Sequence, residues 1–524
     1  MGIGGPPLSK LTGYVGVVEK ERFFRLRLPD TPTDNNELKA SLTAQRLAVI
    51  GLFLYAAFAP HSIAAAEISL ALVGGAWLVR TLRTRQTGTR HTIVDLPVWL
   101  LFLWSILSAA FSAEPRISLL KLQSLCVFLL FYLTQAVVTR RIAVLLILTT
   151  ILSGVAGTLY SSFDLLRGRG VLVESLAPSS LLRAANVEPG DAVWRVGQRR
   201  VYSSGDIDNA IRDARPGTRL ALSVISQGEH IERPGFMVTA EMQTLASPSG
   251  ITGEKRAHRF RASGWTRHYE TFSEILQLLV QLSLGLALAN FQNHGLNRRF
   301  KLATAAALIL AVGVGLTAMR TSLVALAIGA AVVVGRAARG ATRVLVIVAI
   351  IVILLFGAAV VYQTRATNAL WFKDPSSSLR LRVAQVGLSR ILLHPVFGHG
   401  MDSMQRHWSE WGFPGKDMIH LHSTPLQLAF DRGLPALAFW LWAIVSCWLL
   451  VTRAEREARD RSDTNAHGVL LGTCGAVAGF FASSLVNYNF GDAEVVLLFW
   501  WLMGIAAVLA ARPSAASTSK GAKS

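Results

Sequence analysis

Runs of apolar residues, each near the ~20 residues that a helix needs to cross a bilayer, recur along most of this chain. Because a backbone in lipid must satisfy its own hydrogen bonds, such runs cross a membrane as helices. The sequence therefore predicts a mainly α fold, a polytopic membrane helix bundle of about 12 spans. The first two runs also suit one re-entrant element kinked at Ala59-Pro60-His61. The runs lie at residues 43–60, 62–82, 93–111, 117–138, 141–163, 270–291, 301–318, 320–337, 342–363, 424–451, 466–487 and 492–511.

The overall composition agrees with a membrane bundle and excludes a soluble globular enzyme. Of the 524 residues, 52% are hydrophobic and only 16% are charged. The formal net charge of +20 does not indicate nucleic-acid binding, because Lys and Arg gather in alternate short loops between the apolar runs. The cysteines Cys126, Cys447 and Cys474 all lie within apolar runs and lack disulfide or metal-site spacing, which indicates packing residues.

The basic loops predict how the chain is oriented. Every second loop is basic, as at Arg140-Arg141 and Arg298-Arg299, and such loops favour the cytoplasm. We therefore expect cytoplasmic termini and two periplasmic polar inserts in a bacterial inner membrane. No apolar core of a cleavable signal peptide is evident at the N-terminus. The predicted order is a tail (1–42), spans one to five (43–166), a polar domain (168–240), a linker (241–267), spans six to nine (268–363), a catalytic loop (364–423), spans ten to twelve (424–512) and a tail (513–524).

The first insert, residues 168–240, consists of short alternating segments with turn signals, which predicts a β-rich domain. The Pro189-Gly190-Asp191 turn, the helix from Ser204 and the Pro216-Gly217 turn follow in an order that resembles bacterial PDZ domains. The resemblance implies a groove at a sheet edge that binds a peptide or a protein C-terminus as an added strand. A spacer with an empty groove is the alternative. A Ser-, Gly- and Pro-containing stretch from 243 to 253 predicts a flexible connection after the domain. The backbone implied to line the groove is that of Arg169, Gly170, Val171 and Leu172.

The second insert contains a helical stretch and then a loop rich in His and Trp; long loops in compact folds usually carry function. Its residues resemble the O-antigen ligase and polymerase superfamily of membrane glycosyltransferases. That superfamily shows a helix with Arg, then Pro-x-x-Gly-x-Gly, then His-Asn or His-Ser, then Glu-x-Gly-x-x-Gly. Ser423, Asp431 and Pro435-Ala436 depart modestly from the commoner residues, and the resemblance covers most of residues 250–490. The matching residues here are Arg380, Pro395, Gly398, Gly400, His422-Ser423 and Asp431-Arg432-Gly433.

Two earlier segments extend the resemblance. Arg320 opens an apolar run as in the superfamily's Ser-Arg-Gly segment, and the stretch 260–268 supplies a second arginine before the sixth span. Either Arg267 or Arg261 fits that second position. The resemblance implies transfer of a glycan from undecaprenyl diphosphate to an acceptor. It implies His422, Arg320 and Arg267 as catalytic residues, and Arg261, Arg380, His268 and Trp265 as substrate-binding residues.

Elementary chemistry fits these implied roles. Arginine binds phosphate oxygens through paired hydrogen bonds and keeps its charge, so it suits a diphosphate. Histidine, with an ordinary pKa near 6.5, suits removal of a proton from the acceptor hydroxyl. The tryptophans of the inserts, Trp265, Trp408 and Trp411, suit either stacking on sugars or anchoring at the membrane interface.

Metal-dependent chemistries are less well supported by the sequence. The histidines of the second insert are an alternative Zn²⁺ site, but their spacing is irregular and no cysteine joins them. No Asp-x-Asp pair lies in that insert, so we expect no metal and no cofactor. The His-Glu-x-x-His pattern of a metalloprotease is absent from the sequence, and no Ser–His pair in the runs suits a serine protease.

Several partners and one non-enzymatic interpretation stay open. A lipid A core acceptor would make the protein a ligase, a growing glycan an O-antigen or exopolysaccharide polymerase, and a protein side chain an O-oligosaccharyltransferase. Membrane lipids are expected around the spans, and nucleic acid is not an expected partner. The rival is a PDZ-bearing membrane scaffold or a transporter. A transporter would need ionisable residues within its spans, and these runs contain few.

Overall fold

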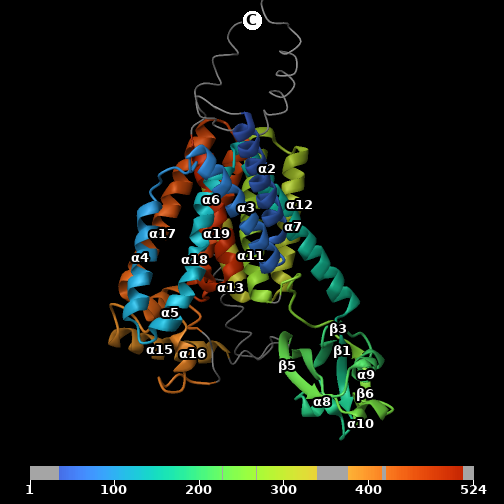
Figure 1. The fold of residues 1–524 in the computed structure, drawn as a ribbon. Coiled ribbons are helices and arrows are strands. Elements are labelled where there is room, and N and C mark those ends of the chain that lie inside the picture. Colours follow the sequence, from blue (N-terminus) through green and yellow to red (C-terminus); the bar gives the residue numbers. More distant parts are fainter. Residues whose placement is uncertain (1–34, 227, 267, 339–375, 416–419, 512–524) are drawn as a thin grey trace, which may run out of the picture.

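The computed structural model describes residues 35–226, 228–266, 268–338, 376–415 and 420–511. The predicted run 342–363 and Arg267 therefore lie outside the described residues. The part of the chain that is described forms a helix bundle with a small sheet domain at one end (Figure 1).

Ten helical stretches among the described residues are long and apolar enough to cross a membrane, which makes this a multi-pass membrane protein. Each predicted run within those residues is helical, and the total of about twelve spans stays a prediction. One stretch, Pro115–Val137, is composed of α5 (Pro115–Lys121), η2 (Leu122–Phe128) and α6 (Leu129–Val137). α4 (Asp95–Phe111) is apolar but shorter. The others are α2 (Asn35–Phe58), α3 (Ile63–Thr84), α7 (Arg140–Arg167), α11 (Tyr269–His294), α12 (Arg298–Leu316), α13 (Arg320–Ala337), α17 (Thr424–Asp460), α18 (Thr464–Ser484) and α19 (Ala493–Ala510).

The first two runs form a helical hairpin rather than one kinked element. The chain turns between α2 and α3, where the Ser62 side chain accepts a hydrogen bond from the Ala65 amide at 3.3 Å and caps α3. The helices approach closely because Gly51 faces Val73: a Cβ at Gly51 would lie 2.8 Å from Val73 Cγ2. Small residues at such contacts are typical of membrane helices.

Helices α11 and α18 form the centre of the bundle and are buried along most of their length. Three glycines allow their backbones to touch. A Cβ added at Gly472 would lie 2.5 Å from the Leu282 Cα, and one added at Gly468 would lie 2.9 Å from the Leu286 Cα. Gly285 faces the Gly472 backbone in the same way. This close packing fixes α11, whose first turn lies at the candidate site.

The sheet domain contains one antiparallel sheet with the order β5-β4-β2-β1-β6, and β3 pairs with β2. Its small core is formed by apolar side chains from the strands and from α9, whose first turn is fixed by a capping box between Ser203 and Asp206. The strands are β1 (Val171–Leu176), β2 (Ala192–Val196), β3 (Arg199–Arg200), β4 (Arg219–Ser226), β5 (Glu229–Met237) and β6 (Ile251–Arg256), and the helices are α8 (Leu181–Ala184), α9 (Ser204–Asp213) and α10 (Ala240–Thr244).

The sheet corrects two sequence expectations. Part of the predicted linker 241–267 belongs to the domain, because β6 pairs with β1 and the Gln243 side chain donates through Nε2 to the Ala214 carbonyl at 2.5 Å. The predicted groove beside Arg169, Gly170, Val171 and Leu172 is not an open edge. Val171 pairs with Val193 of β2 on one side and with Arg256 of β6 on the other. The PDZ resemblance did not reveal that a later strand of the same chain occupies this position.

The sheet domain is docked on the bundle. Arg169 forms an ion pair with Asp164 at the end of α7, and its guanidinium lies 4.7 Å from the Phe260 ring centroid. The Arg261 amide donates to the Gly228 carbonyl at 3.1 Å. Figure 1 shows α15 (Ser376–Leu393) and α16 (Ser403–Arg406) at the same end of the bundle. We call this end the sheet end, and the other the opposite end.

Candidate functional site

His422 lies at the sheet end, immediately before α17. Its backbone is in the left-handed region with φ 52°, which turns the chain before the extended N-cap residue Ser423. The His422 amide donates to Nδ1 of His420 at 3.3 Å, and the two rings are 4.4 Å apart. The His420 ring in turn lies 5.6 Å from the Tyr488 ring. The His420 ring therefore lies between the His422 ring and the segment that follows α18.

Arg320 is joined to the His422 segment through one asparagine. Arg320 is the first residue of α13, and its neighbour Thr321 accepts a hydrogen bond from the Asn487 side chain at 3.1 Å. The Asn487 carbonyl accepts from the Thr424 amide, also at 3.1 Å. The two predicted catalytic residues thus lie on segments bridged by Asn487. Nη1 of Arg320 is buried and has no hydrogen-bond partner among the described residues.

Arg380 completes a basic group beside the histidines. It projects from α15, and its nearest carboxylate is Glu270 of α11, 3.6 Å from Nη2. Its Nε is buried without a partner among the residues that the structure describes. An arginine held this loosely by one carboxylate retains donors for an anionic ligand.

The environment keeps both histidines unprotonated. Burial, then the neighbouring His420, then Arg380 lower the pKa of His422 to about 3. Burial and Arg380 lower the pKa of His420 to about 4. Both rings are therefore neutral at physiological pH, the state in which an imidazole can accept a proton.

The other predicted substrate contacts lie on the segment before α11. The guanidinium of Arg261 lies 4.4 Å from the Tyr269 ring centroid, and His268 is the N-cap residue of α11 without a side-chain capping bond. Trp265 is half exposed and stacks on Tyr160 of α7 at 4.5 Å. Its ring contacts therefore join it to α7 and, through His61 at 4.6 Å, to the α2–α3 turn. Their part in substrate binding stays a prediction.

Beneath the site lies a buried carboxylate that the sequence reasoning passed over. Glu274 of α11 accepts hydrogen bonds from the Asn487 side chain at 2.8 Å and from the Ser483 hydroxyl at 2.9 Å. Its Oε2 has no partner among the described residues. A glutamate inside an apolar run marks a functional position in membrane proteins, and that signal was available from the sequence. Glu274 holds the asparagine that bridges the Arg320 and His422 segments.

The two glycine motifs of the second insert pair with each other. The His399 amide donates to the Phe430 carbonyl at 2.7 Å, and the Leu434 amide donates to the Pro395 carbonyl at 2.8 Å. Gly433, with φ 79°, interrupts α17 where this pairing occurs. A side chain there would collide with the Val396 carbonyl. The glycines are thus required for the loop to lie against the start of α17 and to place His422.

The remaining histidines and tryptophans of the insert have packing or ion-pair roles. His399 is buried and stacks on Phe430 at 4.6 Å, and His407 lies between Glu114 at 3.2 Å and Glu410 at 2.6 Å. Trp408 is 3% exposed, which leaves no face for a sugar. Within the described ranges, no group of three or more His, Cys, Asp or Glu residues is arranged to hold a metal ion.

Comparison with known families gives a match, which overlaps the candidate site. Residues 305–441 match the family described as O-antigen ligase. This match supports the ligase-like superfamily of membrane enzymes, and it contains Arg320, Arg380, both glycine motifs and His422. Comparison of the chain with curated proteins gave no match.

The ligase match does not cover the whole site. Glu274 and Asn487 lie on either side of it in the sequence, yet they hold its arginine and histidine segments together. The sheet domain also lies outside the match. The ligase-like part of the chain therefore depends on flanking helices for its geometry.

Proposed function

We propose that this protein is a membrane glycosyltransferase of the O-antigen ligase type, which moves a glycan from undecaprenyl diphosphate to an acceptor. The observation that carries the proposal is the position of His422. Its ring is neutral, half-buried and beside Arg380. Hydrogen bonds through Asn487 join its segment to the Arg320 segment. This arrangement lies within the stretch that matches O-antigen ligases.

The arginines bind the diphosphate in this proposal. Arg320 and Arg380 each have a buried guanidinium nitrogen without a partner among the described residues. The Arg320 segment is bridged to the His422 segment by Asn487, and the charge of Arg380 acts on the His422 ring. Arg267 or Arg261 supplies a further positive charge from the segment before α11. Guanidinium groups stabilise the negative charge that develops on the leaving diphosphate, so no divalent metal is required.

His422 takes the proton from the acceptor hydroxyl as its oxygen attacks the anomeric carbon. The bond between that carbon and the diphosphate oxygen breaks, and undecaprenyl diphosphate leaves with the electron pair. The low pKa of His422 in the free protein would make it a weak base. Because a bound diphosphate offsets the charge of Arg380, donor binding raises the pKa of His422 and strengthens the base when it is needed.

The orientation follows from the basic loops. The α11–α12 turn with Arg298 and Arg299 and the last turns of α17 with Arg453 and Arg456 lie at the opposite end, so that end faces the cytoplasm. The site and the sheet domain then face the periplasm of a bacterial inner membrane, where the acceptor is a lipid A core, a growing glycan or a protein. We retain a PDZ-like role for the sheet domain, with a peptide added at the outer edge of β5 or β6 instead of β1.

The test uses purified full-length protein and a polyprenyl-diphosphate-linked glycan, with release of free polyprenyl diphosphate measured by mass spectrometry. We expect release that requires an acceptor and is unchanged by EDTA. Activity that is lost in EDTA and restored by a divalent ion would overturn the arginine-based mechanism. Failure to release polyprenyl diphosphate with lipid A core, glycan and peptide acceptors would favour the scaffold or transporter instead.

A further inference from the structure

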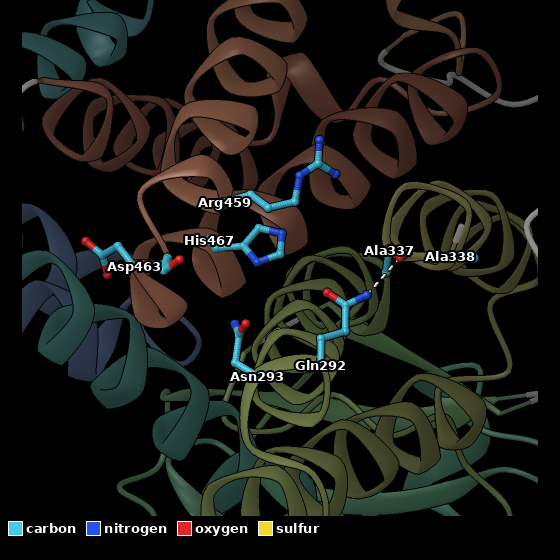
Figure 2. A pocket seen from close by; sticks show the side chains of 8 residues that line it. Gln292, Asn293, Ala337, Ala338, Arg459, Asp463 and His467 are labelled. Carbon is cyan, nitrogen blue, oxygen red and sulfur yellow. Dashed lines mark hydrogen bonds between the residues drawn. The ribbon is translucent and has the colours of Figure 1, made fainter. Parts of the chain in front are cut away.

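A cavity lies at the opposite end of the bundle, far along the helices from His422. It has a volume of about 570 Å³ and is lined by residues from the ends of α11, α13 and α17 and the start of α18. Figure 2 shows the side chains of Arg459 and His467 on one side of it, and Gln292 and Asn293 facing them. The ligase-type chemistry proposed above makes no use of this cavity.

A buried charge cluster forms one wall. The Glu455 side chain is fully buried and forms an ion pair with Arg336 of α13. Its Oε1 also lies 3.1 Å from Nε2 of His467, which is itself buried. Both carboxylate oxygens of Glu455 therefore already have a partner, which limits the hydrogen bonds that Glu455 can accept from another cation.

Arg459 is a second arginine near Glu455, whose carboxylate is already paired with Arg336. Its Nη1 lies 3.7 Å from Glu455 Oε1, which is too long for a hydrogen bond; its side chain is 36% exposed, and the residue lines the cavity. Among the residues that the structure describes, two arginines around this one carboxylate leave one positive charge uncompensated. A guanidinium with free donors at a cavity wall is suited to an anion.

Asp463, the acid among the described residues that line the cavity, does not cancel this charge. Asp463 Oδ2 forms an ion pair with Arg140 at 2.8 Å, and Oδ1 accepts a hydrogen bond from the Ala466 amide at 3.1 Å. Both of its oxygens therefore have partners within the protein. The amides of Gln292 and Asn293 and the Ser462 hydroxyl supply neutral polar groups around the same space.

We propose that this cavity binds a phosphate group, with Arg459 as its principal contact and the buried His467 behind it. The cavity lies at the ends of spanning helices, the depth at which phospholipid headgroups lie, and basic pockets between such helices bind anionic headgroups. The group is carried either by a phospholipid of the adjacent leaflet or by a soluble phosphate. The proposal does not rest on the proposed glycosyl transfer.

The experiment compares wild-type protein with three variants. Arg459→Gln removes the cavity charge, Arg459→Lys keeps it, and Arg456→Gln removes an exposed arginine of the same helix that does not line the cavity. Delipidated full-length protein is titrated with phosphatidylglycerol and followed by native mass spectrometry. A parallel titration uses inorganic phosphate and follows the melting temperature.

We expect one tightly bound phosphatidylglycerol in the wild type and in Arg456→Gln, with affinity about tenfold or more lower in Arg459→Gln. Arg459→Lys should retain most of the affinity. If inorganic phosphate instead raises the melting temperature in an Arg459-dependent way without lipid retention, the ligand is a soluble phosphate. Equal lipid and phosphate binding by wild type and Arg459→Gln would overturn the site.

Discussion

At the scale of single residues, the surroundings of His422 favour its neutral form. Its pKa is lowered to about 3 by burial, by His420 and by Arg380. In the proposed mechanism the neutral ring accepts the proton, so activity should be lost as the pH falls through this pKa. We expect kcat/KM, which reports the free enzyme, to hold from pH 8 to about 5 and to fall only toward pH 3. The acid limb of kcat should lie at higher pH, because bound diphosphate offsets Arg380.

Arg380→Gln removes one cause of the lowered pKa of His422. The acid limb of kcat/KM in this variant should therefore move to higher pH. The exposed neighbour Arg382 offers a matched control, and Arg382→Gln should leave the limb in place. A wild-type limb near pH 6.5 would contradict the position assigned to His422.

Glu274 acts as a positioning residue. Glu274→Ala removes an acceptor shared by the Asn487 side chain and the Ser483 hydroxyl, and the loss of these buried hydrogen bonds costs about 1–3 kcal/mol, although Asn487 keeps its bond to Thr321. We expect a lower melting temperature together with reduced kcat. Glu274→Gln keeps an acceptor oxygen and should restore most of both. A Gln variant as impaired as the Ala variant would show that the negative charge, rather than positioning, is what matters.

At the scale of elements, the pairing of the loop 395–400 with the start of α17 is the feature that places His422. Gly433→Ala puts a Cβ against the Val396 carbonyl at positive φ, and we expect a loss of about 3 kcal/mol or more in stability and a large loss of activity. Gly412 also has positive φ, 76°, but open space around it. Gly412→Ala should therefore cost only about 1–2 kcal/mol. Equal thermal shifts for the two variants would contradict the pairing.

At the scale of the whole molecule, the orientation is open to a labelling test. In a background with Cys126, Cys447 and Cys474 replaced by Ser, a cysteine is introduced at Gly190 of the sheet domain or at Arg456 of the opposite end. A membrane-impermeant maleimide added to intact spheroplasts should label the first and spare the second until the membrane is permeabilised. The reverse pattern would place the site in the cytoplasm.

The sequence predicted the helices well because each span is specified locally, by about 20 apolar residues in a row. The resemblance singled out His422, Arg320 and Arg380, and the structure bridges the His422 and Arg320 segments through Asn487, while the roles of all three residues stay predictions. What the sequence could not show was pairing between distant segments. The strand β6 occupies the edge expected beside Arg169, and Asn487 bridges two segments far apart in the chain. Such contacts are decided by the tertiary fold.

The central claim is that His422 and Arg320 act together on a polyprenyl-diphosphate donor. It is tested most directly by glycan transfer with purified wild-type protein, His422→Ala, Arg320→Ala and the control His394→Ala, each at matched folded concentration. We expect about a 10²–10⁴-fold loss of kcat for His422→Ala and about a 10²–10³-fold loss for Arg320→Ala, with His394→Ala near wild type. Transfer by His422→Ala at a rate within a fewfold of wild type would contradict the account.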